Sequence, residues 1–450
     1  MGRFPTKEYK ALARLGLPVL VTQLGIITVS FADTMMVGAY GTNELGAASF
    51  VNNLFLVPIV ALIGFAGGMT PIVGALFGRG SLDEAGTSLR AGLMLNVGIA
   101  LLLSAVMTGV YFLLPGFRQP EELMPLIRPY FLIILSSILP TAVYNCCINA
   151  SNGLTDTAMP MWIMVGGNLL NVCGNYLLIF GKLGCPELGL VGAGISTVVS
   201  RVLMAVAILL GFRLRRRYLP LRSGVWRRAS SGLYFRVWKT SYPIMIQSGI
   251  ECTLWALGAV VCGWFGTPQL ASYQIANIVG QLGFMIYLSA GVAVSIRIAN
   301  FTGIRDVDAI RTSSRAGLHL MMVMATAASL VFIFAGSHLF SLFTEDSVVI
   351  EAGLPLVIPL ILYQYFDATQ LNYACSLRGT GDVKPLITVA VVSYILVGAG
   401  ALFLFALGFG MGHTGVYYSF SVTLACAAVM LVYYFRRAVR AIASNDFKTI

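Results

Sequence analysis

Long apolar runs separated by short polar turns recur along the whole chain. Each run holds about 20 to 30 residues, enough for a helix to cross a hydrocarbon core of roughly 30 Å. Twelve such runs predict an all-α integral membrane protein with twelve transmembrane helices. The predicted spans cover residues 9–38, 45–77, 86–115, 122–150, 157–180, 188–212, 237–264, 269–298, 308–340, 347–377, 384–408 and 414–437.

The second half of the chain repeats the first at an offset near 225 residues. Pro18 corresponds to Pro243, and the RAGL segment at 90–93 corresponds to the same letters at 315–318. A register kept through six spans predicts two pseudo-symmetric six-helix bundles. Because six is even, both halves enter the membrane from the same side, as parallel repeats. We therefore expect an N-terminal lobe at 1–212, a basic cytoplasmic linker at 213–236 and a C-terminal lobe at 237–450.

The distribution of charged residues along the chain indicates its orientation in the membrane. The chain is 58% hydrophobic and 10% charged, which excludes a soluble globular protein. Its net charge of +11 comes from Lys and Arg in every second loop, with Arg118 and Lys182 on the other side and Arg128 and Arg201 within spans. This asymmetry predicts cytoplasmic termini and no nucleic-acid partner. The linker is expected to be a flexible tether that anchors topology, and binding of anionic membrane lipid is the alternative.

Glu251 lies in the middle of the apolar run from Ser241 to Trp264, with no basic residue nearer than Lys239. A charged side chain at the centre of a bilayer costs roughly 2.5 to 3.5 kcal/mol on insertion scales, so it is kept where it faces a protein interior or a water-filled path. We interpret Glu251 as part of a functional site. A protonated acid bonded to a neighbouring helix is the alternative.

Two further acids occur in or near spans. Asp367 follows Tyr363 by one helical turn on the same face. A phenol beside a carboxylate can hydrogen-bond the acid or lend an oxygen to a hard cation. Asp33 lies near the end of the first span and either faces lipid headgroups or serves as an ion or substrate ligand. The repeat does not duplicate these acids, which predicts different tasks for the two halves.

Amides and one cation add to the polar positions. Asn168, Asn171 and Asn175 recur at spacings of three and four, so they line one face of the fifth span and either bond adjacent helices or form a polar site. Arg201 lies deep in the sixth span and either pairs with an acid or snorkels to an interface. The eight cysteines and three histidines show no metal-ligand spacing, so neither a zinc site nor a disulfide framework is expected.

In combination, these residues resemble the multidrug and toxic compound extrusion (MATE) transporters, in the bacterial NorM-type branch. The stretch from Asn171 to Thr197, NVCGNYLLIFGKLGCPELGLVGAGIST, is similar to the segment that joins the fifth and sixth helices of that family. Pro243 with Glu251 eight residues later resembles its helix-seven signature. Asp367, eleven residues before the Arg of LRGTGDVKP, resembles its helix-ten signature. The resemblance covers nearly the whole chain.

The resemblance implies an antiporter of the bacterial cytoplasmic membrane that exports organic cations or drugs in exchange for Na⁺ or H⁺, by alternating access of two lobes. It implies no cofactor beyond the coupling ion, and we expect a monomer that works among membrane lipids on small amphipathic or cationic substrates. By position, Glu251, Asp367 and Tyr363 correspond to a cation site in the C-terminal lobe, with Na⁺ held by the two carboxylates. Asp33, Asn171 and Asn175 correspond to a polar site in the N-terminal lobe, and Pro18 to a hinge.

Two other functions make different demands on the sequence. A flippase for lipid-linked saccharides, on a similar pair of bundles, would line its cleft with Arg or Lys to meet phosphates, whereas the deep charges here are mainly acidic. A membrane-bound enzyme would need a surface loop with clustered His, Asp or nucleophiles, and the sequence offers none. We therefore expect no enzymatic activity and keep the flippase as the alternative.

Overall fold

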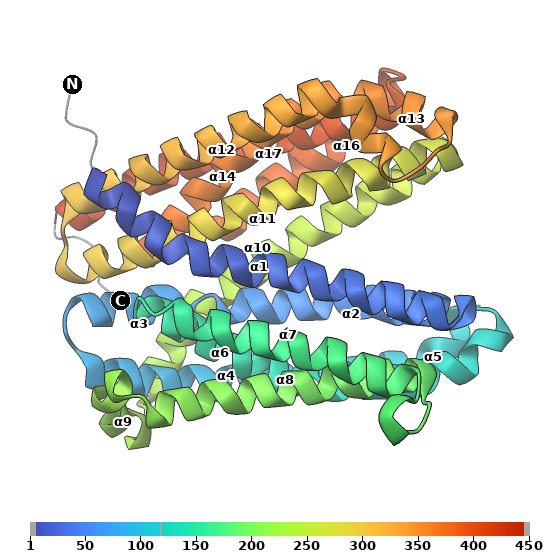
Figure 1. Ribbon diagram of the computed structural model, residues 1–450. Coiled ribbons are helices and arrows are strands. Elements are labelled where there is room, and N and C mark those ends of the chain that lie inside the picture. Colours follow the sequence, from blue (N-terminus) through green and yellow to red (C-terminus); the bar gives the residue numbers. More distant parts are fainter. Residues whose placement is uncertain (1–5, 118, 445–450) are drawn as a thin grey trace. The chain divides into compact units, whose positions relative to one another are not determined.

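The computed structural model describes residues 6–117 and 119–444, so Arg118 of the charge pattern lies outside the described residues. Within these ranges, twelve helical segments are long and apolar enough to cross a membrane, which confirms the predicted number. Figure 1 shows the helices. They are α1 (Thr6–Tyr40), α2 (Thr42–Ala66), α3 (Met69–Gly78), α4 (Leu82–Leu113), α5 (Met124–Ser136), α6 (Ile138–Gly153), α7 (Ala158–Ile179), α8 (Gly189–Leu214), α9 (Leu219–Trp226), α10 (Ser231–Gly263), α11 (Thr267–Ile304), α12 (Val307–Ser341), α13 (Ser347–Gly353), α14 (Val357–Thr380), α15 (Pro385–Val389), α16 (Gly400–Phe403) and α17 (Gly412–Ala443).

The chain forms two compact units whose boundaries fall inside helices. The N unit is Val21–Met245, and the C unit is Met1–Leu20 together with Ile246–Ile450. The first helix of each repeat, α1 and α10, therefore contributes its beginning to one unit and its end to the other. This division differs from lobes cut at residues 212 and 237. That those lobes move as bodies stays a prediction.

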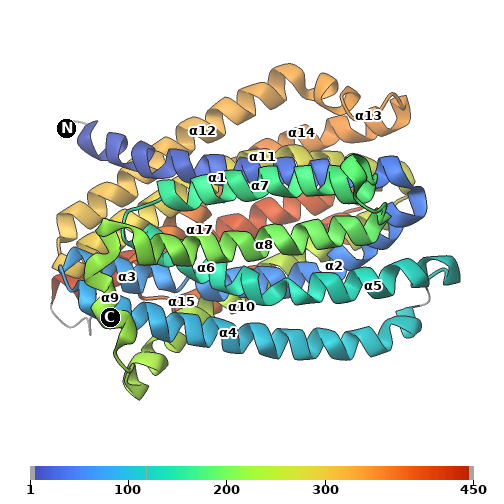
Figure 2. The same cartoon turned by 60° about the horizontal axis from the view of Figure 1, so that its bottom comes forward.

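In the N unit, aromatic side chains and close helix contacts form the interior. Phe55 of α2 and Phe131 of α5 are each at most 1% exposed, and their ring centroids lie 4.8 Å apart. The helices α7 and α8 run side by side (Figure 1, Figure 2). At the end of α6, a Cβ added to Gly153 would lie 2.8 Å from the backbone nitrogen of Gly74 in α3. Only glycine allows so close an approach of the two backbones.

The C unit contains the same kind of close backbone contact at a glycine. The helix α14 packs against α11 and α17 around a buried apolar core. A Cβ added to Gly379 at the end of α14 would lie 2.8 Å from the carbonyl oxygen of Ser295 in α11. Gly379 is the repeat partner of Gly153, so the sequence repeat preserves one close backbone contact in each half.

The eleventh span is irregular. It begins as α15, continues as a π-helical segment, Ala390–Ala399, returns to α16 and ends in a second π-helical segment, Leu404–Gly408. A π-helix closes wider turns than an α-helix and often marks a functional position. The first π segment places Ser393 and Tyr394, at most 1% exposed, inside the C unit.

The expectation of a flexible linker is wrong for its central part. Residues 219–226 form α9, which packs on α4 of the same unit. Arg90 Nη1 of α4 donates to the carbonyl oxygens of Trp226 and Arg227, each at 3.1 Å, and a Cβ added to Gly86 or Gly224 would overlap the facing backbone. One glycine on each helix therefore makes room for the backbone of the other and lets the linker helix dock.

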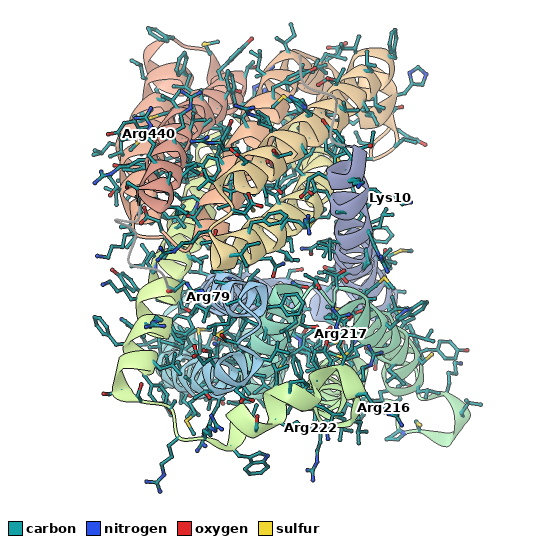
Figure 3. The ribbon with its side chains drawn as sticks, turned by 90° about the vertical axis from the view of Figure 1, so that its left-hand side faces the viewer. Lys10, Arg79, Arg216, Arg217, Arg222 and Arg440 are labelled. Carbon is teal, nitrogen blue, oxygen red and sulfur yellow. The ribbon has the colours of Figure 1, made fainter. Side chains whose placement is uncertain are left out.

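Basic side chains gather at this end of the N unit. Figure 3 shows Arg216, Arg217 and Arg222 of the linker at the same end as Arg79, which follows α3. Their clustering agrees with the alternation of basic loops along the sequence.

A buried tyrosine fixes the segment that precedes α9. The hydroxyl of Tyr218, 1% exposed, donates to Asp156 Oδ2 at 2.6 Å. Asp156 Oδ1 accepts from the backbone nitrogen of Met159 at 3.2 Å, in the first turn of α7. Arg217 Nη2 donates to the carbonyl oxygen of Leu154 at 2.8 Å. The linker is thus bound to the connection between α6 and α7.

Candidate functional site

Glu251 and Asp367 come together inside the C unit. Glu251 lies on α10 after the unit boundary, Asp367 lies on α14, and the two carboxylates interact electrostatically. Asp367 is 1% exposed, and its Oδ2 has no hydrogen-bond partner among the described residues. An unpartnered buried carboxylate oxygen is costly, so it indicates a position where a cation, a proton or water binds.

Tyr394 of the π-helical segment connects this pair of acids to Gln370. Its hydroxyl is close enough to the Glu251 carboxylate to interact with it electrostatically. The same oxygen accepts from Gln370 Nε2 at 3.1 Å. Gln370 lies three residues after Asp367 on α14, and its Oε1 has no partner in the described part of the chain. Glu251, Asp367, Tyr394 and Gln370 form what we call the acidic site.

Tyr363 borders the acidic site, one turn before Asp367. It is 8% exposed and interacts electrostatically with both carboxylates. The ring of Trp255 meets it edge-on, with centroids 5.5 Å apart at 87°. The structure thus brings together the three residues that the resemblance assigned to the cation site, and an indole fixes the phenol ring.

A half-buried cation, Arg378, lies further along the same helices. Arg378 Nη2 donates to Gln247 Oε1 at 2.9 Å, and Arg378 also attracts Glu251 electrostatically. Sequence reasoning missed Tyr394, Gln370, Gln247 and the internal role of Arg378. The spacing of three between Asp367 and Gln370 could have indicated Gln370.

The N unit holds the second predicted set. Asn175 Nδ2 of α7 donates to Asp33 Oδ1 of α1 through a short hydrogen bond, and also lies 3.5 Å from Asn171 Oδ1. Asn171 Nδ2 donates to Thr197 Oγ1 of α8 at 3.3 Å. Asp33, Asn171 and Asn175 are therefore neighbours, as predicted. We call them, with Thr197 and Arg201, the N-unit polar site.

The described contacts of Arg201 match neither an ion pair with an acid nor a bond at an interface. Its Nη1 donates to Ser137 Oγ at 2.6 Å, and the guanidinium attracts Asp33 and Tyr130 electrostatically. In the described residues it makes no carboxylate ion pair within 4.0 Å. Arg201 is thus a nearby countercharge to Asp33, held by a neutral hydroxyl.

Two predicted residues lie apart from these sites. Asn168, half-buried on α7, faces Gly25 of α1, where an added Cβ would lie 2.8 Å from Asn168 Nδ2. Pro18 lies inside α1, two residues before the unit boundary. Its role as a hinge stays a prediction.

The chemistry of the two sites differs. The acidic site places two carboxylates beside the neutral oxygens of Tyr394 and Gln370, which suits a proton or a hard monovalent cation. Among the described residues no group of three or more His, Cys, Asp and Glu gathers, so a cation here would depend on neutral oxygens as well. The N-unit polar site combines one carboxylate with one guanidinium.

Fold and sites together define a multi-pass membrane protein made of two six-helix repeats, with acids inside helices long and apolar enough to cross a membrane. The MatE family matches residues 18–177 and 243–404, two stretches that begin 225 residues apart. The chain belongs to the MatE family. The two matched stretches coincide with the predicted repeat and confirm it.

Known relatives match this chain over nearly its whole length. A probable multidrug resistance protein NorM of Pseudomonas putida is 29% identical over 446 residues, covering 96% of this chain and 95% of the relative. A multidrug resistance protein NorM of Vibrio vulnificus is 27% identical and covers 94% of each chain. The crystal structure of the eukaryotic MATE transporter AtDTX14 is similar with a TM-score of 0.86 at 18% identity, covering 98% of this chain and 99% of that one. The NorM-type resemblance and the predicted fold are confirmed.

Proposed function

We propose that this protein is a secondary active antiporter that exports organic cations and drugs across the bacterial cytoplasmic membrane in exchange for Na⁺ or H⁺. The observation that carries the proposal is the pair of interacting carboxylates of Glu251, half-buried, and Asp367, buried, with Asp367 Oδ2 unpartnered in the described structure. The relatives are named multidrug resistance proteins, which supports drugs as the cargo.

The coupling ion acts at the acidic site. Two carboxylates in a medium of low polarity do not both stay ionised comfortably, so the pair gains from one proton or one cation. A Na⁺ ion would take oxygens from both acids, with the hydroxyl of Tyr394 and Oε1 of Gln370 as neutral ligands. A proton needs no further ligand. The same four side chains therefore support either ion.

Ion and drug drive the cycle by favouring differently facing states. A ligand shifts such an equilibrium only through its differential affinity for the two states. Binding of the ion to the acidic site removes negative charge, and this favours release of a cationic drug. Alternating access of the two lobes, with α1 bending near Pro18, completes the proposed mechanism, and neither a cofactor nor a second subunit is needed for it.

The orientation follows from the basic loops. Lys and Arg gather in alternate loops, the linker among them, and such loops stay in the cytoplasm. We infer that both termini are cytoplasmic. Export then runs from the side that carries α9 toward the opposite side.

Reconstituted vesicles test the proposal. A fluorescent amphipathic cation is followed while a Na⁺ gradient and a pH gradient are imposed separately, with the membrane potential held at zero. We expect at least one gradient to drive transport of the dye. Transport that ignores both gradients but requires ATP would overturn the proposal, and movement of a lipid-linked saccharide without movement of dye would favour the flippase.

Matched variants assign the coupling. Glu251→Gln and Asp367→Asn keep the side-chain shape and remove the charge, so we expect both to abolish gradient-driven transport. The control is Glu351→Gln, which removes an exposed acid on α13 of the same unit. Gradient-driven transport that survives in both site variants would remove the acidic site from the mechanism.

A further inference from the structure

Arg378 is a half-buried cation of the C unit to which the proposed coupling gives no task. It lies in the last turn of α14, eleven residues after Asp367. Eleven residues make about three helical turns, so Arg378 and Asp367 lie on the same side of α14, roughly 16 Å apart along its axis. Arg378 therefore extends the polar face of α14 that carries the acidic site.

Two side chains of α10 meet this face. Gln247 and Glu251 are four residues apart, so they share one side of α10 and lie about 6 Å apart along its axis. Arg378 Nη2 donates to Gln247 Oε1 at 2.9 Å, and Arg378 attracts Glu251 electrostatically. In the described structure Arg378 and Glu251 form no ion pair within 4.0 Å. A neutral amide thus holds the guanidinium about one turn away from the carboxylate.

The contact between Arg378 and Gln247 leaves two buried donors without acceptors. Gln247 is 0% exposed, and neither its Nε2 nor Arg378 Nε has a hydrogen-bond partner among the described residues. A buried N–H without an acceptor is costly. The carboxylate of Glu251, one turn further along α10, is an acceptor that a small movement of the guanidinium brings within reach.

The backbone on either side of Arg378 is fixed, so such a movement involves the side chain. A Cβ added to Gly379, the next residue, would lie 2.8 Å from the carbonyl oxygen of Ser295 in α11. Gly381 ends α14 in a left-handed conformation, with φ at 80°, which glycine adopts readily. The long and flexible side chain of Arg378 can therefore shift its charge by one turn without moving the helix.

A guanidinium beside Glu251 competes with a cation for the same negative charge. When an ion leaves the acidic site, two carboxylates remain close together in surroundings of low polarity, which is unfavourable. A guanidinium can donate two parallel hydrogen bonds to a carboxylate and so compensate its charge. Because Arg378 is covalently part of α14, it cannot leave with the ion. A cation of this kind lowers the cost of releasing the ion.

We propose that Arg378 is a positioning residue whose guanidinium replaces the coupling ion beside Glu251 when the ion leaves, and that Gln247 holds the guanidinium aside while the ion is bound. This inference rests on the proposed function and adds to it a residue that controls ion release. The competing explanation is structural, in which Arg378 only joins the end of α14 to α10.

Ion binding to the purified full-length protein in detergent tests the inference, without any gradient or dye. The probes are Na⁺, followed by isothermal titration calorimetry, and protons, followed by tryptophan fluorescence during a pH titration, because Trp255 packs against Tyr363 beside the acids. Arg378→Gln removes the competing cation, so we expect Na⁺ or protons to bind about tenfold more tightly. Gln247→Leu frees the guanidinium to approach Glu251, so we expect the same ion to bind several-fold more weakly.

A double variant shows whether Gln247 acts through Arg378. Gln247→Leu should have no effect once Arg378 is absent, so the double variant should bind the ion as tightly as Arg378→Gln. Weaker binding in the double variant would overturn the role of Gln247. The control is Arg440→Gln, which removes an exposed cation from α17 of the same unit and should leave ion binding unchanged.

The direction of the change decides between the two explanations. Ion binding that is unchanged or weaker in Arg378→Gln would overturn the inference and favour the structural role. Where Arg378→Gln does not fold, Gln247→Leu decides, and ion binding as tight as in the wild type or tighter would overturn the inference.

Transport separates this inference from the proposed function. Slower ion release in Arg378→Gln should lower both the maximal rate of dye transport and the half-saturating ion concentration, each by several-fold. A wild type that binds neither ion and moves no dye under either gradient would contradict the antiporter, and the inference with it. Wild-type ion binding and gradient-driven dye transport, with unchanged ion binding in Arg378→Gln, would keep the antiporter and overturn the role of Arg378.

Discussion

Pro18 and Pro243 each lie two residues before the point at which their helix passes from one compact unit to the other. In α1 the boundary follows Leu20, and in α10 it follows Met245. A proline inside a helix removes one backbone hydrogen bond and lowers the resistance to bending. In both repeats, therefore, the easily bent position coincides with the change of unit.

We expect Pro18→Ala and Pro243→Ala to slow transport by several-fold without changing dye affinity. Alanine restores the missing backbone bond, so the helix bends less readily when the units exchange states. The measurement is the initial rate of dye transport in vesicles beside equilibrium binding in detergent.

The control for these variants is Pro58→Ala, because Pro58 lies within α2 and α2 belongs entirely to the N unit. It should leave the rate unchanged. Equal slowing in all three variants would show that proline loss acts through general helix packing and not through the unit boundary.

Tyr394 supplies a second prediction, because its hydroxyl accepts a hydrogen bond from Gln370 and interacts electrostatically with Glu251. Tyr394→Phe removes a hydroxyl beside the two carboxylates and a neutral oxygen ligand of the proposed ion site, so we expect the coupling ion to bind roughly tenfold more weakly. The measurement is the Na⁺ concentration or pH that gives half-maximal dye transport. Tyr273→Phe serves as control, since this buried tyrosine of the same unit bonds the carbonyl oxygen of Trp255 at 3.4 Å, outside the acidic site. A half-maximal value that shifts equally in both variants would contradict the role of Tyr394.

The acids of the acidic site could be found from sequence because a charge in an apolar run is conspicuous and Tyr363 follows the period of an α-helix. Tyr394 could not, since the π-helical segment that carries it departs from that period. The partner of Arg201 is Ser137, 64 residues earlier, and no local pattern connects two such positions. These contacts are set by tertiary packing.

The prediction of a flexible linker was wrong for a different physical reason. Pro220 and Gly224 in a basic stretch are typical of a loop, and its residues alone favour no single conformation. Docking of α9 depends on Gly86 of α4, which lies far away in sequence and makes room for the linker backbone. Local composition therefore indicated a tether where the fold supplies a binding surface.

An ion pair fixes the beginning of α1 to the C unit and gives a third prediction. Arg297 Nε and Nη2 donate to the two carboxylate oxygens of Glu8 at 2.9 and 2.8 Å, and Ser313 Oγ donates to the same carboxylate at 2.6 Å. The side chains of Glu8 and Arg297 are 13% and 25% exposed, so water screens the pair only in part. A double-mutant cycle of Glu8→Ala and Arg297→Ala, measured by unfolding in detergent, should give a coupling free energy of about 1–3 kcal/mol.

The matched control is the pair Asp308 and Arg311 on α12. Its atoms lie 3.7 Å apart, and its side chains are 95% and 48% exposed. Exposed pairs of this kind contribute about 0–1 kcal/mol, so the same cycle should give a value near zero. A coupling at Glu8 and Arg297 no larger than in the control pair would contradict the proposed attachment of α1.

The fourth prediction concerns the bond between Tyr218 and Asp156, which lies outside the membrane-spanning segments. Tyr218→Phe leaves a buried carboxylate oxygen with one partner fewer, so we expect the free energy of unfolding to fall by about 1–3 kcal/mol and α9 to exchange its amide hydrogens faster. Tyr234→Phe is the control, because this hydroxyl contacts only the sulfur of Met94 among the contacts described for it.

The dependence of this effect on pH follows from the pKa of Tyr218. Burial, together with the hydrogen bond to Asp156, raises that pKa above its ordinary value. A group whose pKa is higher in the folded state stabilises that state fully below the unfolded pKa, about 10 for tyrosine, and loses this contribution as pH rises through the higher folded value. The difference in melting temperature between wild type and Tyr218→Phe should therefore be constant from neutral pH to about pH 9 and shrink above pH 10. A difference that grows with alkaline pH would mean that the folded protein favours the phenolate, which the buried bond to a carboxylate does not allow.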